Sequence, residues 1–412
     1  MFVSITNTPR PYAWGSRSAI AELVGRERSV EPEAELWFGA HSGSPSVIVD
    51  PAAVGGARTL DEWISADPVA ALGSPDAERL PFLLKLLAAE APLSLQAHPT
   101  PGQAREGFAR ENRAGVPLDA PNRNYSDEFA KPEILVALSE TFEAVCGFRE
   151  LAESRAVIRD LAERAEASSS LELWASRLEG HGIPDGADPL EHAVAWLSAG
   201  GSEVDEIVRV LTGASAAVSA EESAPPATLL AARTVTLLAE HHPGDPGIAV
   251  ALLLNRVTLR RGEALYLPAG NIHAYLHGLG VEIMTASDNV LRGGLTVKHV
   301  DVGELTSVLD FSATPPPVIE PERPSEGIEI FRPDVRDFVL ARVDAASRDG
   351  SDPVLVGLTG PAIALCTGGE VVIRDETTGE NATLSPGQAS YLTPEVTAVA
   401  VSGGELFVAM PG

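Results

Sequence analysis

Cysteine and long apolar runs are both scarce in this chain, and each shortage excludes a class of protein. Only Cys146 and Cys366 occur among the 412 residues, which excludes a disulfide framework and a Cys-x-x-Cys metal clip. No apolar stretch approaches the roughly 20 residues that span a bilayer. The first residues also lack the basic patch and apolar run of a signal peptide. We therefore expect a globular protein of the reducing cytoplasm.

Positive charge is scarce as well. The 30 lysines and arginines face 58 acidic residues, so the net charge is −28, which argues against nucleic acid or an anionic membrane as the main partner. Only three of the cations are lysines, Lys85, Lys131 and Lys298, and apolar residues flank each one. A buried lysine is a compact charge that can lose its proton. We expect these lysines to face one cavity that binds an anion or moves a proton; the alternative is snorkelling side chains.

The hydrophobic patterning changes twice along the chain. Strand and turn patterns with some helix give way at residue 149 to apolar residues at helical spacing, and strand patterns return at residue 247. A proline-rich stretch over 313–327 is typical of a linker. We therefore predict a mainly β protein with an α-helical insertion. Its expected units are a discontinuous catalytic one over 1–148 and 244–312, the helical insertion over 149–243, and a C-terminal one over 313–412.

A faint internal repeat links the two strand-rich units. "RRGEALYLPAG" (260–270) and "LSPGQASYLTPE" (384–395) both read Gly-x-Ala-x-Tyr-Leu, followed by proline. A short strand entered from a glycine turn, present twice, suggests two double-stranded jelly rolls. The first copy continues into His273 and the second into a stretch without histidine. We therefore expect only the first unit to carry a metal site.

Four polar side chains from three segments form a plausible ligand set for a divalent metal. Gln96 and His98 share one face of the alternating strand "LSLQAH", Glu133 begins an apolar strand, and His273 follows a turn. A buried carboxylate is costly unless it is paired or bound to a metal. A thiolate-free nitrogen and oxygen set suits zinc, but also manganese, iron or cobalt. The alternatives are a strand-edge hydrogen bond for Gln96 and an ion pair between Glu133 and Lys131.

A second concentration of polar residues lies within residues 280–301. Arg292 stands beside Gly293 and Gly294, where the small residues allow a ligand to approach the backbone closely. The alternative is a surface arginine at a turn. The other polar side chains of this stretch are Glu282, Asp288, Asn289 and Lys298.

Seven stretches together resemble the type I phosphomannose isomerases, also called mannose-6-phosphate isomerases, over most of residues 1–310. The resemblance implies zinc, one ion per chain, on Gln96, His98, Glu133 and His273, with Arg292 as a catalytic residue. It also implies two cupin-like jelly rolls with an inserted helical domain. His277 departs from the expected pattern, and we interpret it as a loop residue rather than a ligand. The stretches are "ELWFGAH", "PFLLKLL", "LSLQAHP", "KPEILVAL", "CGF", "LYLPAGNIHAYLHGLGVEIM" and "SDNVLRGGLTVKHVD".

The implied reaction interconverts mannose 6-phosphate and fructose 6-phosphate through a cis-enediol. The metal would stabilise charge on oxygen, and Glu282 or Lys131, with Asp288 as a third candidate, would move the proton. Cations would hold the phosphate and offset negative charge. We expect a monomer that acts on a small sugar phosphate. The residues expected to contact the substrate are Arg292, Lys298, Lys85, Ser94 and Tyr275.

Two other functions fit the same residues less well. The first is a metal-binding cupin with another activity, such as an oxygenase or a different sugar-phosphate isomerase. Oxygenases of this fold typically use more histidines at an iron than the two in this ligand set. A sugar-phosphate-binding protein without catalysis would not need Glu282, Arg292 and a full ligand set together. Oxygen uptake with added iron would support the first alternative, and tight binding without turnover the second.

Overall fold

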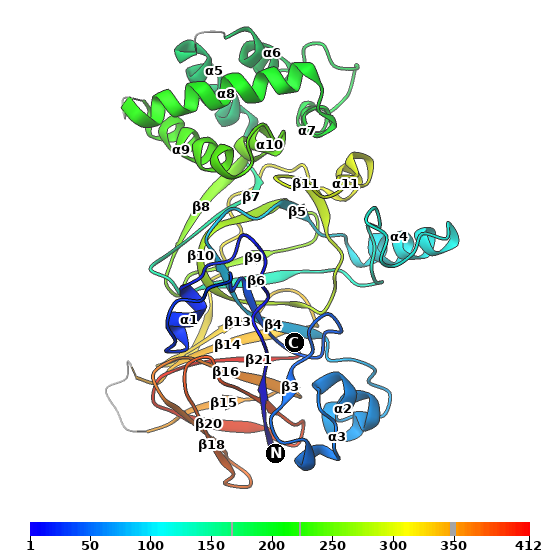
Figure 1. The fold of residues 1–412 in the computed structure, drawn as a ribbon, viewed down its shortest axis with the longest axis vertical. Coiled ribbons are helices and arrows are strands. Elements are labelled where there is room, and N and C mark those ends of the chain that lie inside the picture. The colour runs from blue at the N-terminus through cyan, green and yellow to red at the C-terminus, as the bar shows by residue number, and fades with distance from the viewer. Residues whose placement is uncertain (166–167, 222–223, 347–351) are drawn as a thin grey trace.

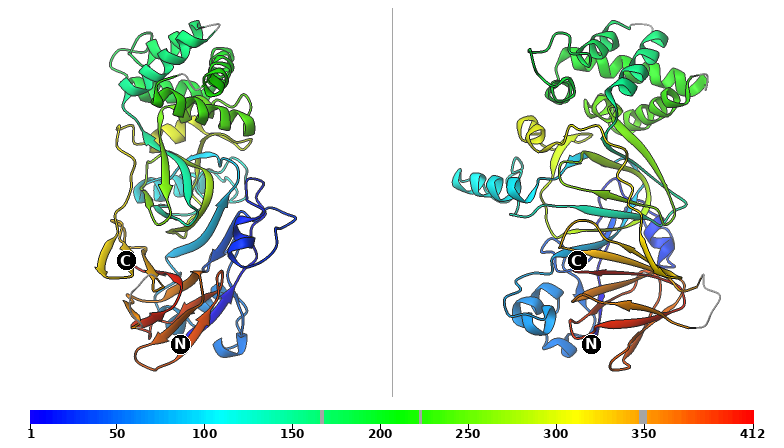
Figure 2. Two further views of the ribbon diagram at one scale, coloured as in Figure 1. Left: turned by 90° about the vertical axis from the view of Figure 1, so that its left-hand side faces the viewer. Right: turned by 180° about the vertical axis from the view of Figure 1, so that it is seen from behind.

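The computed structural model describes residues 1–165, 168–221, 224–346 and 352–412 of the chain. These residues form three levels along the long axis (Figure 1). A helical block lies at one end, a curled antiparallel sheet in the middle, and the C-terminal strands at the other end. Figure 2 shows the same three levels from two other directions.

The middle level is a nine-stranded antiparallel sheet organised around one long strand, β10 (His273–Thr285). The first part of β10 pairs with β5 and β7, and the second part with β4 and β6, so the sheet curls around a common interior. Because four of these strands pair with β10, side chains that are distant in sequence face this interior together. The other strands are β2 (Glu35–Phe38), β4 (Phe82–Ala89), β5 (Leu95–Ala97), β6 (Glu133–Ala137), β7 (Thr141–Phe148), β8 (Leu254–Arg260), β9 (Ala264–Leu267) and β11 (Leu291–Gly294).

Strand β4 explains the almost wholly apolar stretch around Lys85. Leu84, Leu86 and Ala88 pack in the core shared with the C-terminal strands, whereas Leu87 and Ala89 face the interior of the curled sheet. Successive side chains of a strand point to opposite faces. A strand buried on both faces therefore reads as a continuous apolar run, and Lys85 falls on the interior face.

Helices occupy most of the stretch 149–243 for which a helical insertion is predicted, but the strand predicted to begin at residue 247 is wrong for its first six residues. These residues form helix α10 (Gly247–Leu252), which is wholly buried in the helical core. Periodicity cannot distinguish a short apolar strand from a buried helical turn, and tertiary packing decides here. The other helices of the block are α5 (Leu151–Arg164), α6 (Ser169–Arg177), α7 (Pro189–Ala199), α8 (Ser202–Glu221) and α9 (Pro226–His241).

Short helices also connect strands outside the insertion, so the fold is mixed rather than mainly β. Thr59 holds the N-cap position of α2, but its side chain makes no capping bond; instead, Glu62 accepts from the backbone amide of Arg58. No described helix is long and apolar enough to cross a membrane. The elements are α1 (Ala19–Leu23), the 3-10 helix η1 (Pro51–Val54), α2 (Leu60–Ala66), α3 (Pro68–Leu72), α4 (Pro101–Arg113) and α11 (Val302–Val308).

The C-terminal level contains an eight-stranded and a four-stranded antiparallel sheet. The N-terminal strand β1 (Phe2–Thr6) lies in the larger sheet between β19 (Ala389–Leu392) and β3 (Val47–Ile48), so part of residues 1–148 lies in this level together with the C-terminal strands. The predicted linker is partly ordered as strand β12 (Glu322–Ser325). The remaining strands are β13 (Ile328–Phe331), β14 (Val339–Asp344), β15 (Val354–Gly357), β16 (Ala362–Gly368), β17 (Val371–Asp375), β18 (Asn381–Leu384), β20 (Ala398–Ser402) and β21 (Glu405–Met410).

The repeated motif adopts the same local structure in both places. Strands β9 and β19 each begin two residues after a glycine, Gly262 or Gly387. These glycines have φ of 87° and 82°, a left-handed conformation that side chains with a Cβ rarely adopt. The prediction of a short strand entered from a glycine turn is therefore confirmed in both units.

Candidate active site

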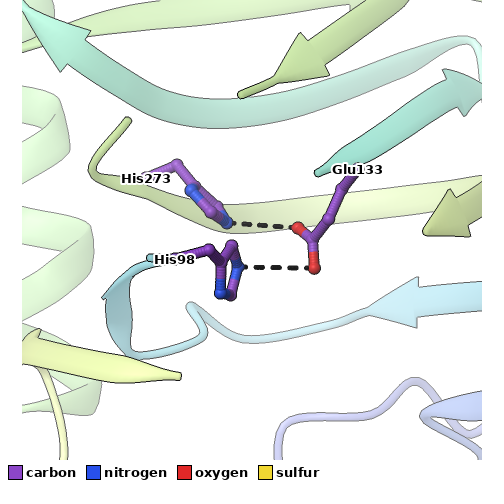
Figure 3. A group of neighbouring side chains, drawn as sticks. All are labelled: His98, Glu133 and His273. Atoms are coloured by element: carbon purple, nitrogen blue, oxygen red, sulfur yellow. Dashed lines mark ion pairs between the residues drawn. The ribbon is translucent and has the colours of Figure 1, made fainter. Parts of the chain in front are cut away.

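Three buried side chains converge inside the curled sheet: His98 directly after β5, Glu133 at the start of β6, and His273 at the start of β10 (Figure 3). The Nε2 atom of His98 is 3.4 Å from Glu133 Oε1, and that of His273 is 3.3 Å from Glu133 Oε2. One ligand atom from each residue lies within 4.8 Å of the others. Three of the four predicted ligands are thus brought together.

The opposite ring nitrogens fix the orientation of both histidines. Nδ1–H of His98 donates to the backbone carbonyl of Asn289 at 2.7 Å, and that of His273 donates to the carbonyl of Asn271 at 3.0 Å. A carbonyl can only accept, so each Nδ1 carries a proton, and in a neutral ring the Nε2 atom then offers a lone pair toward Glu133. Histidine metal ligands are typically held in this way.

Three of the atoms that face one another have no hydrogen-bond partner among the described residues. His98 Nε2, His273 Nε2 and Glu133 Oε2 are buried and lack a hydrogen-bond partner, which is rare for buried polar atoms. Burial lowers the pKa of His98 to about 4. Burial alone would raise the pKa of Glu133, but Lys131 and the histidines hold it well below its usual value. Neutral imidazoles and an ionised carboxylate fit a divalent cation.

The predicted fourth ligand, Gln96, lies next to this group on the sheet. Gln96 of β5 is directly opposite His273 of β10 on one side and Arg292 of β11 on the other. Side chains directly opposite each other share a face of the sheet. The register therefore places Gln96 beside the two histidines and Arg292 one strand further along.

A charged row crosses the same interior next to the metal-binding group. Lys85 of β4 is directly opposite Glu282 of β10 and Trp37 of β2. Its Nζ is 3.0 Å from Glu282 Oε2 and 3.8 Å from Glu35 Oε1. Glu35 in turn accepts a hydrogen bond of 2.6 Å from the Trp37 indole. The buried lysine therefore sits between two carboxylates.

Burial and neighbouring charge act in opposite directions in this row. Burial raises the pKa of Glu282; the Lys85 cation opposes this shift, whereas Glu133 and Glu35 add to it. Burial alone would lower the pKa of Lys85, but the carboxylates of Glu282, Glu35 and Glu133 raise it above its usual value. Lys85 thus stays protonated and acts as the counter-ion of Glu282.

Lys131 is the second lysine at the site. Its Nζ is 3.0 Å from Glu133 Oε1, and both side chains are buried. The ion pair considered as an alternative to metal binding is therefore present together with the histidine–glutamate group. Because Glu133 has two oxygens, Oε1 can meet Lys131 while Oε2 remains without a hydrogen bond. The two readings of Glu133 are compatible.

The remaining predicted residues lie at different depths. Tyr275 is buried beside Phe142, and its hydroxyl has no hydrogen-bond partner among the described residues. Ser94 is half-buried ahead of β5. Asp288 is exposed, and its Oδ2 is 3.3 Å from His41 Nε2. His277 is exposed and lies within β10 rather than in the predicted loop.

Sequence reasoning missed three side chains of the site: Glu35, Trp37 and His41. All three belong to "ELWFGAH" (35–41), a stretch that carried the family resemblance but no assigned role. Trp37 and His41 make an edge-to-face contact. The signal that could have found them is a carboxylate and a histidine in a strand whose other residues are apolar.

Arg292 and Lys298 form a cationic end of the site. Arg292 is half-buried and Lys298 is exposed, and no ion pair to an acidic group is seen for either within the described part of the chain. Burial lowers the pKa of Arg292, and burial together with the Arg292 charge lowers that of Lys298. Two neighbouring cations without an acid are unusual in a chain of net charge −28.

The fold and the site define a protein of mixed helices and antiparallel sheets, with a buried group of two histidines and a glutamate that could hold a metal ion. The catalytic-domain model of the type I phosphomannose isomerases matches residues 2–151. Mannose-6-phosphate isomerase of Salmonella typhimurium is 35% identical over 404 residues, which cover 97% of this chain and 96% of that relative. The human mannose-6-phosphate isomerase is 31% identical over 394 residues, covering 89% and 87%.

A solved structure described as mannose 6-phosphate isomerase in its zinc-bound holo form has the same fold. It matches with a TM-score of 0.84 and 33% sequence identity, covering 100% of this chain and 99% of that one. A second such structure, bound with zinc and yttrium, matches equally well, with a TM-score of 0.84. The chain belongs to the type I phosphomannose isomerase family.

Proposed function

We propose that this protein interconverts mannose 6-phosphate and fructose 6-phosphate. One observation carries the proposal: the His98–Glu133–His273 group and the buried carboxylate of Glu282 face the same interior. A bulge in β10 between Tyr275 and His277 shifts the register. His273 at an odd position and Glu282 at an even one can therefore both point inward. An aldose–ketose isomerase needs a Lewis acid and a base side by side.

Zinc is the proposed cofactor, held by His98, Glu133 and His273 with Gln96 as a fourth ligand. The support is the donor chemistry, the orphaned buried nitrogens and the zinc-bound relative described above. A bound zinc ion would supply Lewis acidity toward the sugar oxygens. The side chains of this chain would hold those oxygens near Glu282 and exclude water from them.

Glu282 is the proposed base. It takes the proton from C2 of the open-chain aldose, the C–H electron pair forms the C1–C2 double bond of the cis-enediol, and the C1 oxygen gains a proton. Return of a proton to C1, with loss of the proton from the C2 hydroxyl to balance the one gained by the C1 oxygen, forms the C2 carbonyl and completes the ketose. A pKa raised by burial brings the carboxylate closer to working pH. Lys131 is engaged by Glu133, and Asp288 lies exposed beside His41, so both are weaker candidates.

The phosphate is proposed to bind at Arg292 and Lys298. Their charges have no acidic partner within the described residues, whereas Lys85 is engaged by two carboxylates. We therefore assign Lys85 to the base rather than to the phosphate. At long range a net charge of −28 repels a sugar phosphate, but salt screens this beyond roughly 8 Å. Ser94 lies two residues before Gln96, directly ahead of β5, and is proposed to contact the sugar. Tyr275 is proposed to line the interior next to the bound sugar.

The proposed architecture is a pair of cupin-like jelly rolls with the helical insertion between segments of the first. The repeated strands β9 and β19 support it. The chain has no histidine after His299, in keeping with a second jelly roll that lacks a metal site. The expected monomeric state and cytoplasmic location stay predictions.

The test is an assay of the purified protein with mannose 6-phosphate, following fructose 6-phosphate. We expect turnover that a chelator abolishes and added zinc restores. Absence of turnover in the zinc-loaded protein would overturn the proposal. Oxygen uptake with added iron would then favour the oxygenase alternative, and tight binding of mannose 6-phosphate without turnover a non-catalytic binding protein.

A further inference from the structure

The segment that carries Lys298 is fixed at its base by the helical block. It connects β11 to α11, and its residues Val297 and Lys298 are exposed. Asp245 lies in the turn between α9 and α10, about 50 residues earlier in the chain. Its Oδ1 accepts from the backbone amide of Leu295 at 2.9 Å, and its Oδ2 accepts from that of Thr296 at 3.1 Å.

Two further contacts, made by Leu295 and Gly294, hold the base of the same segment. Leu295 has φ of 55°, the one non-glycine residue with positive φ in the described part of the chain, and its side chain is buried in the helical core. Such a conformation persists only where its surroundings impose it. Gly294 also lies against Gly247 of α10, where a Cβ on Gly294 would come within 2.6 Å of the Gly247 Cα. The Asp245 carboxylate, the buried Leu295 side chain and the contact between Gly294 and Gly247 thus hold the base of the segment together.

The acidic charge of Asp245 does not oppose an anion at Lys298. Three backbone amides surround the carboxylate, since Oδ1 also accepts from Gly247 at 2.7 Å. Amide dipoles directed at a carboxylate offset its charge locally. Asp245 therefore fixes the segment from the side of the helical block while the lysine charge stays available at the tip.

We propose that Asp245 is a positioning residue for phosphate binding, through which the helical block keeps Lys298 beside Arg292. This inference rests on the proposed function, because it assumes that Arg292 and Lys298 hold the sugar phosphate. Asp245 itself does not touch the substrate. The helical block contributes none of the proposed metal ligands, and its part in the site is to set where the phosphate-binding segment lies.

The test compares Asp245→Ala with Asp188→Ala in the zinc-loaded full chain. Asp188 caps α7 in the same helical block by accepting from the amides of Leu190 and Glu191, so its loss costs a similar carboxylate bond without touching the Lys298 segment. We expect Asp245→Ala to raise KM for mannose 6-phosphate about fivefold or more while kcat changes less than about twofold. Asp188→Ala should leave both constants unchanged.

A conservative variant sharpens the comparison. Asp245→Asn keeps one acceptor oxygen for Leu295 and Gly247 but loses the acceptor for Thr296, so its KM should lie between those of the wild type and Asp245→Ala. An unchanged KM in Asp245→Ala would overturn the inference. An equal rise in Asp188→Ala would also overturn it, because the effect would then be a general loosening of the helical block.

Calorimetric binding of mannose 6-phosphate separates this inference from the proposed function. Binding needs no turnover, so a wild type that binds without isomerising overturns the proposed reaction alone. Weaker binding by Asp245→Ala than by Asp188→Ala would then still support the positioning role. A wild type that neither binds nor isomerises the sugar phosphate would overturn both.

Discussion

Lys85 and Glu282 occupy directly opposite positions on β4 and β10, and Lys85 Nζ lies 3.0 Å from Glu282 Oε2 in the buried interior. Lys85 also forms an ion pair with Glu35, which accepts a hydrogen bond from the Trp37 indole. This relationship decides which of the scarce lysines serves the base and which serves the phosphate. It also determines how the base should titrate.

Replacing Lys85 with methionine should move the acid limb of kcat/KM to higher pH. Glu282 must be ionised to accept a proton, so activity falls as the pH drops through its pKa. Burial already raises that pKa and Lys85 opposes the rise, so losing the cation raises it further. The pH profiles of wild type, Lys85→Met and the charge-retaining control Lys85→Arg measure the effect. An acid limb that stays in place in Lys85→Met would contradict the counter-ion role.

Removing the base itself should leave the metal site intact. Glu282→Gln keeps the size of the side chain and should lower kcat by about 10²- to 10⁴-fold, the usual contribution of a general base. Zinc content, measured by atomic absorption, should match that of the wild type. The same loss in Lys131→Met with an active Glu282→Gln would transfer the role of base to Lys131.

Asn289 should govern zinc affinity although it is not a ligand. The backbone carbonyl of Asn289 accepts a hydrogen bond from Nδ1–H of His98. The buried Asn289 side chain accepts a hydrogen bond from the Ser126 amide at 2.7 Å and donates one to the Phe129 carbonyl at 2.8 Å. Asn289→Ala removes the hydrogen bonds that join Asn289 to the segment containing Ser126 and Phe129. Loss of an outer residue that supports a metal ligand typically costs about 10- to 100-fold in metal affinity. Competition with a chelator measures the zinc affinity. The control variant Asn289→Asp keeps only the acceptor for the Ser126 amide. Wild-type affinity in a folded Asn289→Ala would refute the prediction.

Much of the fold could be read from local patterning because those elements are long and periodic. The helices within residues 149–243 show their period clearly. Helix α10 could not be read, because its six apolar residues suit a strand equally well and only packing in the helical core decides. The pairing of β1 with β19 joins the two ends of the chain, and no local pattern indicates such a contact.

Site residues could be predicted from the sequence where the residue type itself indicates the role. They could not be predicted where the role depends on which residues the strand register brings together. His98, Glu133 and His273 are costly to bury without a purpose, so their types and neighbours pointed to a metal. Lys85 was expected at the phosphate, and only its position opposite Glu282 shows the carboxylates that engage it. Asp245 resembled an ordinary acidic residue in a turn, since its partners Leu295 and Thr296 are backbone amides from a distant segment.

Arg292 and Lys298 should differ in how their loss affects catalysis. Besides its proposed contact with the phosphate, Arg292 lies opposite the proposed metal ligand Gln96 and is expected to act in catalysis, so Arg292→Ala should lower kcat by about 100-fold or more. Arg292→Lys should not restore it, because lysine lacks the planar fork. Lys298 lies at the exposed end, so Lys298→Met should chiefly raise KM. Steady-state kinetics across ionic strengths measure both, and a purely KM effect in Arg292→Ala would contradict the assignment.

Cys146 should prove dispensable for zinc although it lies directly opposite His273 in the register of β7 and β10. Its thiol packs among apolar side chains of the interior, and burial raises the pKa of Cys146 to about 12. The thiolate that would bind a metal is therefore disfavoured at neutral pH. Cys146→Ala should keep full zinc content and nearly full kcat, with Tm as the control for packing. A thiolate-to-metal charge-transfer band in the cobalt-substituted wild type, absent from Cys146→Ala, would place the thiol on the metal and refute the nitrogen and oxygen ligand set.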